Sequence, residues 1–162
     1  MTRLSDKRAI LSIDPGPRGV SFVFFENGQL MDWGTWGKRR DELETFDRLL
    51  KRLRPDVLVL EDADAPQSER RARMKRVLRM MAERAEEARV GVRTASRYAV
   101  RRAWLERGRK NKHEVGAALA AMFPEMEILV PRKRKAWTSE DARAGICDAL
   151  ATLVHVCASA KT

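Results

Sequence analysis

Hydrophobic positions near the start of the chain follow the pattern of three short strands. Residues 9–14 (AILSID) form an apolar run that ends on an acid, and Pro15-Gly16 interrupts it. Residues 20–25 (VSFVFF) and 30–36 form two more apolar runs, joined by Asn27-Gly28, a pair typical of a tight hairpin. The pattern therefore predicts a meander of three antiparallel strands.

The rest of the chain alternates between helical and strand patterns. Apolar residues at helical spacing predict helices over residues 41–54, 70–89, 98–107, 113–123 and 141–158. Short apolar runs over residues 56–60 and 90–95 predict two more buried strands. Strands that alternate with helices after a meander indicate an α/β fold, a mixed sheet flanked by helices, and we expect one domain over residues 1–162.

The charge of the chain indicates its class of partner. The sequence has 33 Lys and Arg against 23 Asp and Glu, a net charge of +10. Such a basic domain favours a nucleic acid, while simple solubility and an anionic membrane surface are the alternatives. No apolar run is long enough to span a membrane, and Cys147 and Cys157 lie too far apart in one predicted helix to bridge. We therefore expect a cytoplasmic protein with no membrane contact.

Three basic segments are candidates for contact with phosphates. Phosphate contacts position a protein on nucleic acid without reading its sequence. Many exposed arginines in such segments are only solvated, which is the alternative for each of them. The candidates are Arg70, Arg71, Arg73, Lys75 and Arg76; Arg109, Lys110 and Lys112; and Arg132, Lys133, Arg134 and Lys135.

Three acids occupy positions that suit a catalytic metal site. Asp14 and Glu61 end two predicted buried strands, and α/β proteins bind ligands at the carboxyl ends of their strands. Asp148 lies in an apolar helix, where a carboxylate is unfavourable unless a cation pairs with it. Carboxylates are the ligands that Mg²⁺ prefers, and two such ions can hydrolyse a phosphodiester. The alternatives are a turn residue at Asp14, a solvated strand end at Glu61 and an arginine pair at Asp148.

Four segments, in order, extend this pattern over most of the chain. They are residues 11–16 (LSIDPG), residues 57–61 (VLVLE), Lys112 at the start of a helix, and residues 148–151 (DALA). The ordered set resembles the motifs of RuvC-type Holliday junction resolvases. The resemblance implies an RNase H-like fold, two Mg²⁺ or Mn²⁺ ions, cleavage of branched DNA, and a homodimer. Its subunit contact is expected on the helix over residues 70–89, beside Met80 and Met81.

The ligand set departs from that family at one position. The family usually carries Asp or His three residues before the last acid, where this chain has Gly145. Asp141 shares a helix face with Asp148, so we predict it as a fourth catalytic metal ligand, with Glu140 as its neighbour. Gly145 is expected to leave room for it. The alternative is that Asp141 pairs with Thr138 as a helix cap.

Substrate and activity have further alternatives. Such resolvases often place an aromatic residue just beyond the second motif, but residues 62–67 contain none. The chain could therefore be an RNase H-like nuclease acting on RNA, a hybrid or flapped DNA. It could also be an inactive nucleic-acid-binding module, which Gly145 favours, or a kinase-like protein, which the absence of a second glycine-rich loop disfavours. Because the sequence has no Walker loop, zinc motif or nucleophile elbow, we expect no organic cofactor.

Overall fold

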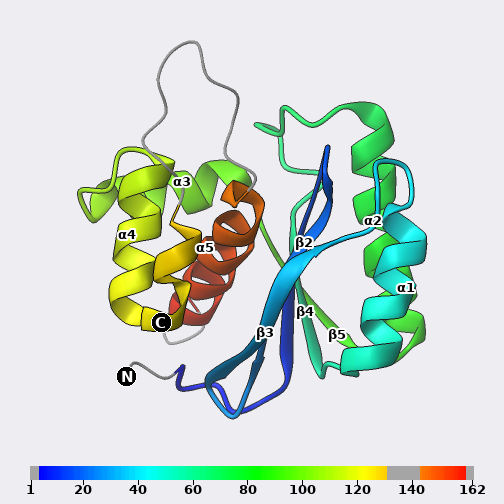
Figure 1. Cartoon of the computed structure of the whole chain (residues 1–162). Helices are drawn as coiled ribbons and strands as arrows, with labels where there is room; N and C mark the ends of the chain where they lie inside the picture. Colours follow the sequence, from blue (N-terminus) through cyan, green and yellow to red (C-terminus); the bar gives the residue numbers. More distant parts are fainter. Residues whose placement is uncertain (1–3, 131–142, 160–162) are drawn as a thin grey trace.

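The predicted mixed sheet is present in the computed structural model, which describes residues 4–130 and 143–159. Within these residues one sheet has the strand order β3-β2-β1-β4-β5 (Figure 1). Its first three strands pair antiparallel, and β4 and β5 continue parallel to β1. The strands are β1 (Ile10–Gly16), β2 (Gly19–Glu26), β3 (Gln29–Trp36), β4 (Val57–Glu61) and β5 (Gly91–Ala95).

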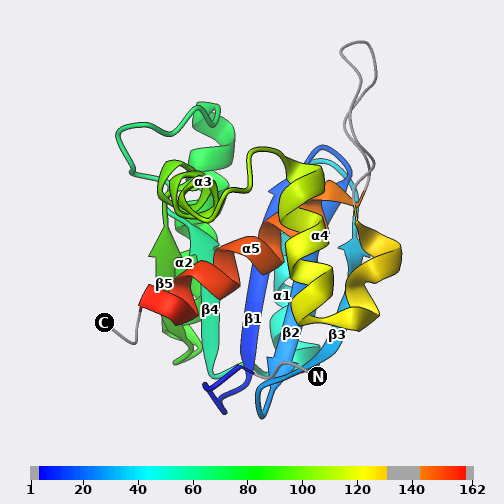
Figure 2. The same ribbon diagram turned by 90° about the vertical axis from the view of Figure 1, so that its left-hand side faces the viewer.

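Helices cover both faces of this sheet (Figures 1 and 2). One face is covered by α1 (Glu42–Leu53) and α2 (Ala72–Glu87). The other is covered by α3 (Arg97–Glu106), α4 (Lys112–Met122) and α5 (Ala144–Ser159). A short 3₁₀ helix, η1 (Pro124–Leu129), follows α4 and was not predicted. Among the described residues, no helix is long and apolar enough to cross a membrane.

The hairpin and helix ends show why the local sequence patterns succeed. Asn27 and Gly28 both have positive φ, 53° and 76°, as the predicted two-residue hairpin turn requires. Asn111 caps α4 by accepting a hydrogen bond from the Glu114 backbone N–H at 2.9 Å. Gly108 follows α3 with a φ of 79°, which ends that helix where predicted.

Alternation along the strands divides the core in two and aims the acids at one face. Leu11 and Ile13 of β1 pack toward α1 and α2, whereas Ile10 packs toward α5. Ser12 points the same way as Ile10, because its buried hydroxyl donates to the Ala149 carbonyl of α5 at 2.6 Å. Two residues further on, period-2 alternation puts Asp14 on the α5 face as well.

The apolar stripe of α2 packs against the sheet and does not form a surface. Val77, Leu78, Met81 and Ala85 are its buried residues. Met81 is 0% exposed and belongs to the core between α2 and the sheet. Met81 is therefore not available for the expected subunit contact, because the sheet takes up the apolar face of this amphipathic helix. Met80 is half-buried, and a subunit contact beside it stays a prediction.

Candidate active site

Asp14, Glu61 and Asp148 come together at the carboxyl edge of the sheet. The parallel register of β1 and β4 pairs Ser12 with Val59, and two residues further along each strand Asp14 and Glu61 both bond Arg70. α5 packs against β1 and carries Asp148 to the same place. All three carboxylates line one pocket, which Arg97, Arg101 and Lys112 also line. The structure thus joins acids that the sequence placed on three separate elements.

Arg70 is bound within this cluster. Its Nη2 bonds Asp14 Oδ1 at 2.9 Å, and its Nε lies 3.2 and 3.3 Å from the two carboxylate oxygens of Glu61. Its Nη1 donates to the Pro15 carbonyl at 3.1 Å. The predicted helix start at Arg70 is wrong by two residues, because α2 begins at Ala72 and Arg70 lies in the preceding loop. That loop lets Arg70 reach back to the ends of β1 and β4.

Arg97 and Lys112 contact the cluster from the first residues of two helices. The guanidinium of Arg97 lies 3.4 Å from Asp14 Oδ1, 3.4 Å from Glu61 Oε1 and 3.7 Å from Asp148 Oδ2. Lys112 Nζ lies 3.0 Å from Asp148 Oδ2. Because both residues begin helices, α3 and α4, the positive ends of two helix dipoles also face this region. The edge therefore attracts anions despite its carboxylates.

Burial, together with the neighbouring carboxylates, changes the acidity of Asp14. Burial raises the pKa of Asp14, and the negative charges of Asp148 and Glu61 raise it further. Arg97 and Arg70 oppose this only in part, so the pKa rises from 3.8 to about 6. Burial alone would lower the pKa of Arg97, but attraction to the same carboxylates outweighs burial and keeps it raised. At Asp14, burial and the neighbouring acids therefore outweigh the attraction of the two arginines.

Ser21 occupies the space that a side chain at position 145 would need, whereas the expectation that Gly145 leaves room for Asp141 stays a prediction, because Asp141 lies outside the described residues. A Cβ at position 145 would lie 2.4 Å from Ser21 Oγ, 3.0 Å from Ser21 Cβ and 3.8 Å from Asp14 Oδ2. The Ser21 hydroxyl is held by a 2.9 Å hydrogen bond with Thr35 Oγ1 on β3. Glycine at 145 therefore allows α5 to approach β2 closely next to the acids.

The donor chemistry of the cluster fits a hard divalent cation. Asp14, Glu61 and Asp148 supply carboxylate oxygens from three elements, the ligand type that Mg²⁺ and Mn²⁺ prefer. As the side chains stand, these oxygens bond Arg70, Arg97 and Lys112. Across residues 4–130 and 143–159, no three acidic, His or Cys side chains are grouped so that they could hold an ion. The carboxylates are therefore of the right type to bind a metal, but in this structure they are paired with arginine and lysine side chains.

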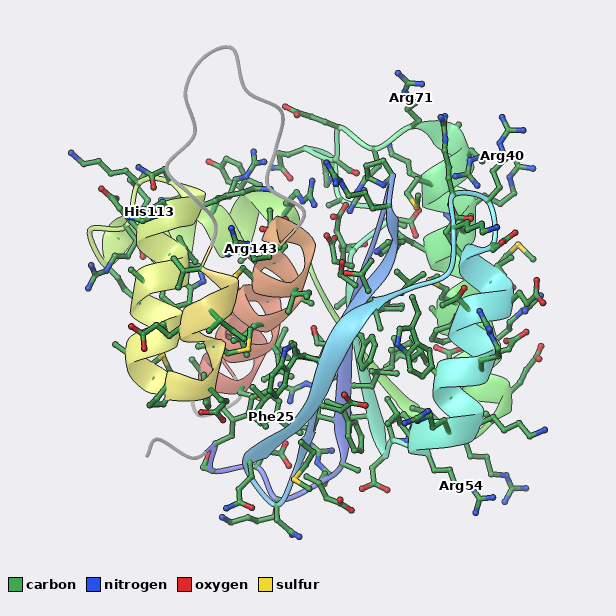
Figure 3. The ribbon with its side chains drawn as sticks, viewed as in Figure 1. Phe25, Arg40, Arg54, Arg71, His113 and Arg143 are labelled. Atoms are coloured by element: carbon green, nitrogen blue, oxygen red, sulfur yellow. The ribbon has the colours of Figure 1, made fainter. Side chains whose placement is uncertain are left out.

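The other predicted phosphate contacts lie in different surroundings. Arg73 bonds the buried acid Glu42 at 2.7 Å. Arg71 projects outward at the upper end of α2, as Figure 3 shows. Exposed or half-buried positions also hold Lys75, Arg76, Arg109 and Lys110. Outside the described residues lie Arg132, Lys133, Arg134, Lys135, Glu140 and Asp141.

Sequence reasoning missed Arg97 and Arg101, which line the pocket from α3. A signal was available, because Arg97 follows the end of β5 by two residues and β5 is parallel to β4. The rule that directed attention to Asp14 and Glu61, that ligands bind at carboxyl ends of strands, applies there too. The helix was instead predicted to start at residue 98, which left Arg97 unassigned.

Comparison with known proteins finds similarity in structure. No protein-family model matches the chain, and no curated protein matches its sequence. Thermus thermophilus RuvC in complex with a Holliday junction matches with a TM-score of 0.63 and 19% identity, over 94% of this chain and 96% of that one. Fowlpox virus resolvase with Holliday junction DNA matches with a TM-score of 0.59 and 12% identity, over 95% and 99%.

A third similar structure is the yeast mitochondrial Holliday junction resolvase, with a TM-score of 0.57 and 12% identity. It matches over 97% of this chain and 80% of that one. The predicted RNase H-like fold is therefore confirmed. At these identities the likeness establishes the fold, so activity has to be argued from the site itself.

Proposed function

We propose that this chain is a metal-dependent endonuclease that cleaves branched DNA such as Holliday junctions. The observation that carries the proposal is the meeting of Asp14, Glu61 and Asp148 at a basic edge of this fold. Two of the similar structures hold Holliday junction DNA, which supports DNA as the substrate. The net charge of +10 is consistent with a polyanionic partner.

The acidic and the basic side chains of the site have separate roles in the proposed mechanism. Asp14, Glu61 and Asp148 would hold two Mg²⁺ or Mn²⁺ ions, with Asp141 proposed as a further ligand. When bound, such ions activate water and stabilise the leaving oxygen of a phosphodiester. Ser12 holds α5 against β1 and so fixes Asp148 relative to Asp14. Lys112 and Arg101 line the same pocket, where they would bind and orient the phosphates beside the scissile bond.

The remaining basic residues extend the proposed contact with the DNA backbone. Basic residues on both sides of the edge would bind phosphates away from the scissile bond. They are Arg71, Lys75 and Arg76 on one side, and Arg109 and Lys110 on the other. We also propose a homodimer, since cleavage of two strands of one junction needs two sites. Sedimentation of the chain with and without junction DNA would test the assembly.

The decisive experiment is cleavage of a labelled four-way junction, with and without Mg²⁺. Linear duplex and single-stranded DNA serve as controls, and the Asp14→Asn protein runs in parallel. We expect Mg²⁺-dependent nicking of the junction that the substitution abolishes. Cleavage of a control but not of the junction would keep the metal site and change the substrate class.

A second candidate is a nucleic-acid-binding module without catalysis. It is favoured by the bonding of the carboxylates to Arg70, Arg97 and Lys112, and by the packing of Ser21 where a ligand at position 145 would stand. Tight junction binding without cleavage of any substrate, in Mg²⁺ or Mn²⁺, would identify this alternative.

A further inference from the structure

Arg97 lies among all three acids. Its Nη2 approaches both Asp14 and Asp148, and its Nε approaches Glu61. The three contacts, at 3.4 to 3.7 Å, are longer than the best charge-assisted hydrogen bonds. Arg97 thus sits among the carboxylates without a short bond to any of them, and its side chain is 37% exposed. Its contacts to the carboxylates are longer than those of Arg70.

Arg70 holds the Asp14–Glu61 pair more tightly. Each of its guanidinium nitrogens bonds an oxygen of Asp14, Glu61 or Pro15, and the side chain is 15% exposed. It contacts Asp14 Oδ1 and Glu61 Oε1, the same oxygens that Arg97 approaches. Both arginines therefore engage carboxylate oxygens that a divalent cation would need as ligands.

Phosphate offers these arginines an alternative partner. An arginine fork binds phosphate through two parallel hydrogen bonds, much as it binds a carboxylate. Arg70 precedes α2 and Arg97 begins α3, at the edge where Lys112 and Arg101 line the pocket. A phosphate bound at this edge would therefore lie near both arginines. If a phosphate bound the two guanidinium groups, oxygens of Asp14 and Glu61 would become available to coordinate a cation.

We propose that Arg70 and Arg97 are positioning residues that compete with divalent cations for the carboxylates and turn to phosphates when nucleic acid binds. The inference rests on the proposed function, because it assumes that the acids are metal ligands. Its consequence is that metal and nucleic acid bind cooperatively. By thermodynamic linkage, DNA must raise the affinity for metal by the same factor as metal raises the affinity for DNA.

The test is a titration of the full chain with Mn²⁺ in the absence of nucleic acid. Electron paramagnetic resonance detects the Mn²⁺ that remains free and so gives the affinity. Arg97→Gln and Arg70→Gln should each bind Mn²⁺ about tenfold more tightly than the unaltered protein. Arg97→Lys, which keeps the charge, should stay near the unaltered value. The matched control is Arg102→Gln, also on α3, whose side chain is 67% exposed and pairs with Glu106 at 3.4 Å. It should leave Mn²⁺ binding unchanged.

Two additions make the result specific. Asp14→Asn combined with Arg97→Gln should lose the gained affinity, which places the ion at the cluster. A 12-base-pair duplex, used as a phosphate probe, should tighten Mn²⁺ binding to the unaltered chain about tenfold. It should have little effect on the protein that carries both arginine substitutions. Thermal unfolding of each variant checks that it is folded.

The outcomes separate this inference from the proposed function. If the glutamine variants bind Mn²⁺ no more tightly than the unaltered chain, the arginines do not compete with metal, whether or not the protein cuts DNA. If they bind more tightly through Asp14 while no substrate is cleaved, the competition stands and the nuclease proposal fails.

Discussion

Two acids of this protein, the buried Glu42 and the half-buried Asp14, both bond to arginine but in different ways. Glu42 bonds Arg73 through two guanidinium nitrogens at 2.7 and 3.3 Å, and it accepts the Arg40 backbone N–H at 3.1 Å. Asp14 instead shares Arg70 with Glu61, and Arg97 with Glu61 and Asp148. Glu42 belongs to a matched pair, whereas Asp14 belongs to a group of acids in contact with shared cations.

The difference shows in the acidity of the two groups. Burial would raise the pKa of Glu42, but the hydrogen bonds from Arg73 and from backbone N–H groups outweigh it, so the pKa is lowered. At Asp14 burial and neighbouring acids outweigh the arginines, and the pKa rises to about 6. A matched pair stabilises the fold, whereas a cluster of like charges is the arrangement expected where a protein binds a cation.

The largest expected contrast is in activity. Asp14→Asn should lower junction cleavage at least about a thousandfold, since it removes a proposed metal ligand. Glu42→Gln should leave cleavage within about threefold, because Glu42 lies on α1, away from the pocket. Single-turnover rates at saturating Mg²⁺ measure both. Equal losses in the two variants would show that buried charge in general, and not the cluster, supports activity.

The second-largest expected contrast is in how Asp14 and Glu42 change the pH dependence of stability. The folded pKa of Asp14, about 6, lies above its ordinary value of 3.8, so the folded state binds the proton more tightly. Its contribution to stability is complete below pH 3.8 and is lost as the pH rises through 6. The stability of the unaltered protein relative to Asp14→Asn should fall by up to about 3 kcal/mol over this range. Urea unfolding without divalent cations measures this stability difference at each pH. A difference that does not change with pH would mean that the folded pKa of Asp14 is not raised.

Glu42 should show the opposite sign and a smaller effect. Its folded pKa lies below 4.5, so its contribution is present above that pH and is lost as the pH falls through the folded pKa. Glu42→Ala should cost about 2 kcal/mol at pH 7, because a buried charge-assisted pair is lost. The cost stays moderate since Arg73 is 42% exposed and water can solvate it. Chemical denaturation checks the value, with Arg79→Gln, a partner in an exposed pair with Asp64, as the near-neutral control.

The same comparison explains what the sequence could predict. Asp14 and Glu61 each end an apolar strand, and parallel strands put their carboxyl ends together, so local pattern was enough to place them. The pairing of Glu42 with Arg73 was not predictable, because it depends on how α1 packs against α2. The place of Arg97 required two facts at once, that β5 adjoins β4 and that α3 starts one residue before the predicted start.

The contact of Gly145 with Ser21 was beyond sequence patterns for another reason. It joins the start of α5 to β2, which are far apart in the chain, and it depends on how closely the two elements approach, since a Cβ at position 145 would lie 2.4 Å from Ser21 Oγ. Periodicity predicted that both elements are buried, but it carries no information about how closely their backbones approach.

The smallest predicted effect concerns this close contact beside Asp14. Gly145→Ala should destabilise the protein by about 1–2 kcal/mol, since the added Cβ overlaps Ser21 and overpacking outweighs the helical preference of alanine. Combining it with Ser21→Gly should recover most of that loss in a double-mutant cycle measured by urea unfolding. The control is Gly91→Ala, where the nearest atom to the new Cβ is 3.6 Å away.

Additive effects of the two substitutions would show that Ser21 and Gly145 do not constrain each other. Coupling would carry a consequence for the cluster itself. A carboxylate at position 145 would need the space of the Ser21 hydroxyl, which lies 2.9 Å from Thr35. Gly145→Asp alone should therefore be more destabilising than Gly145→Ala, because it adds bulk as well as another negative charge near Asp14 Oδ2. With Ser21→Gly the bulk is accommodated, and the remaining cost is the repulsion that a bound Mg²⁺ would relieve.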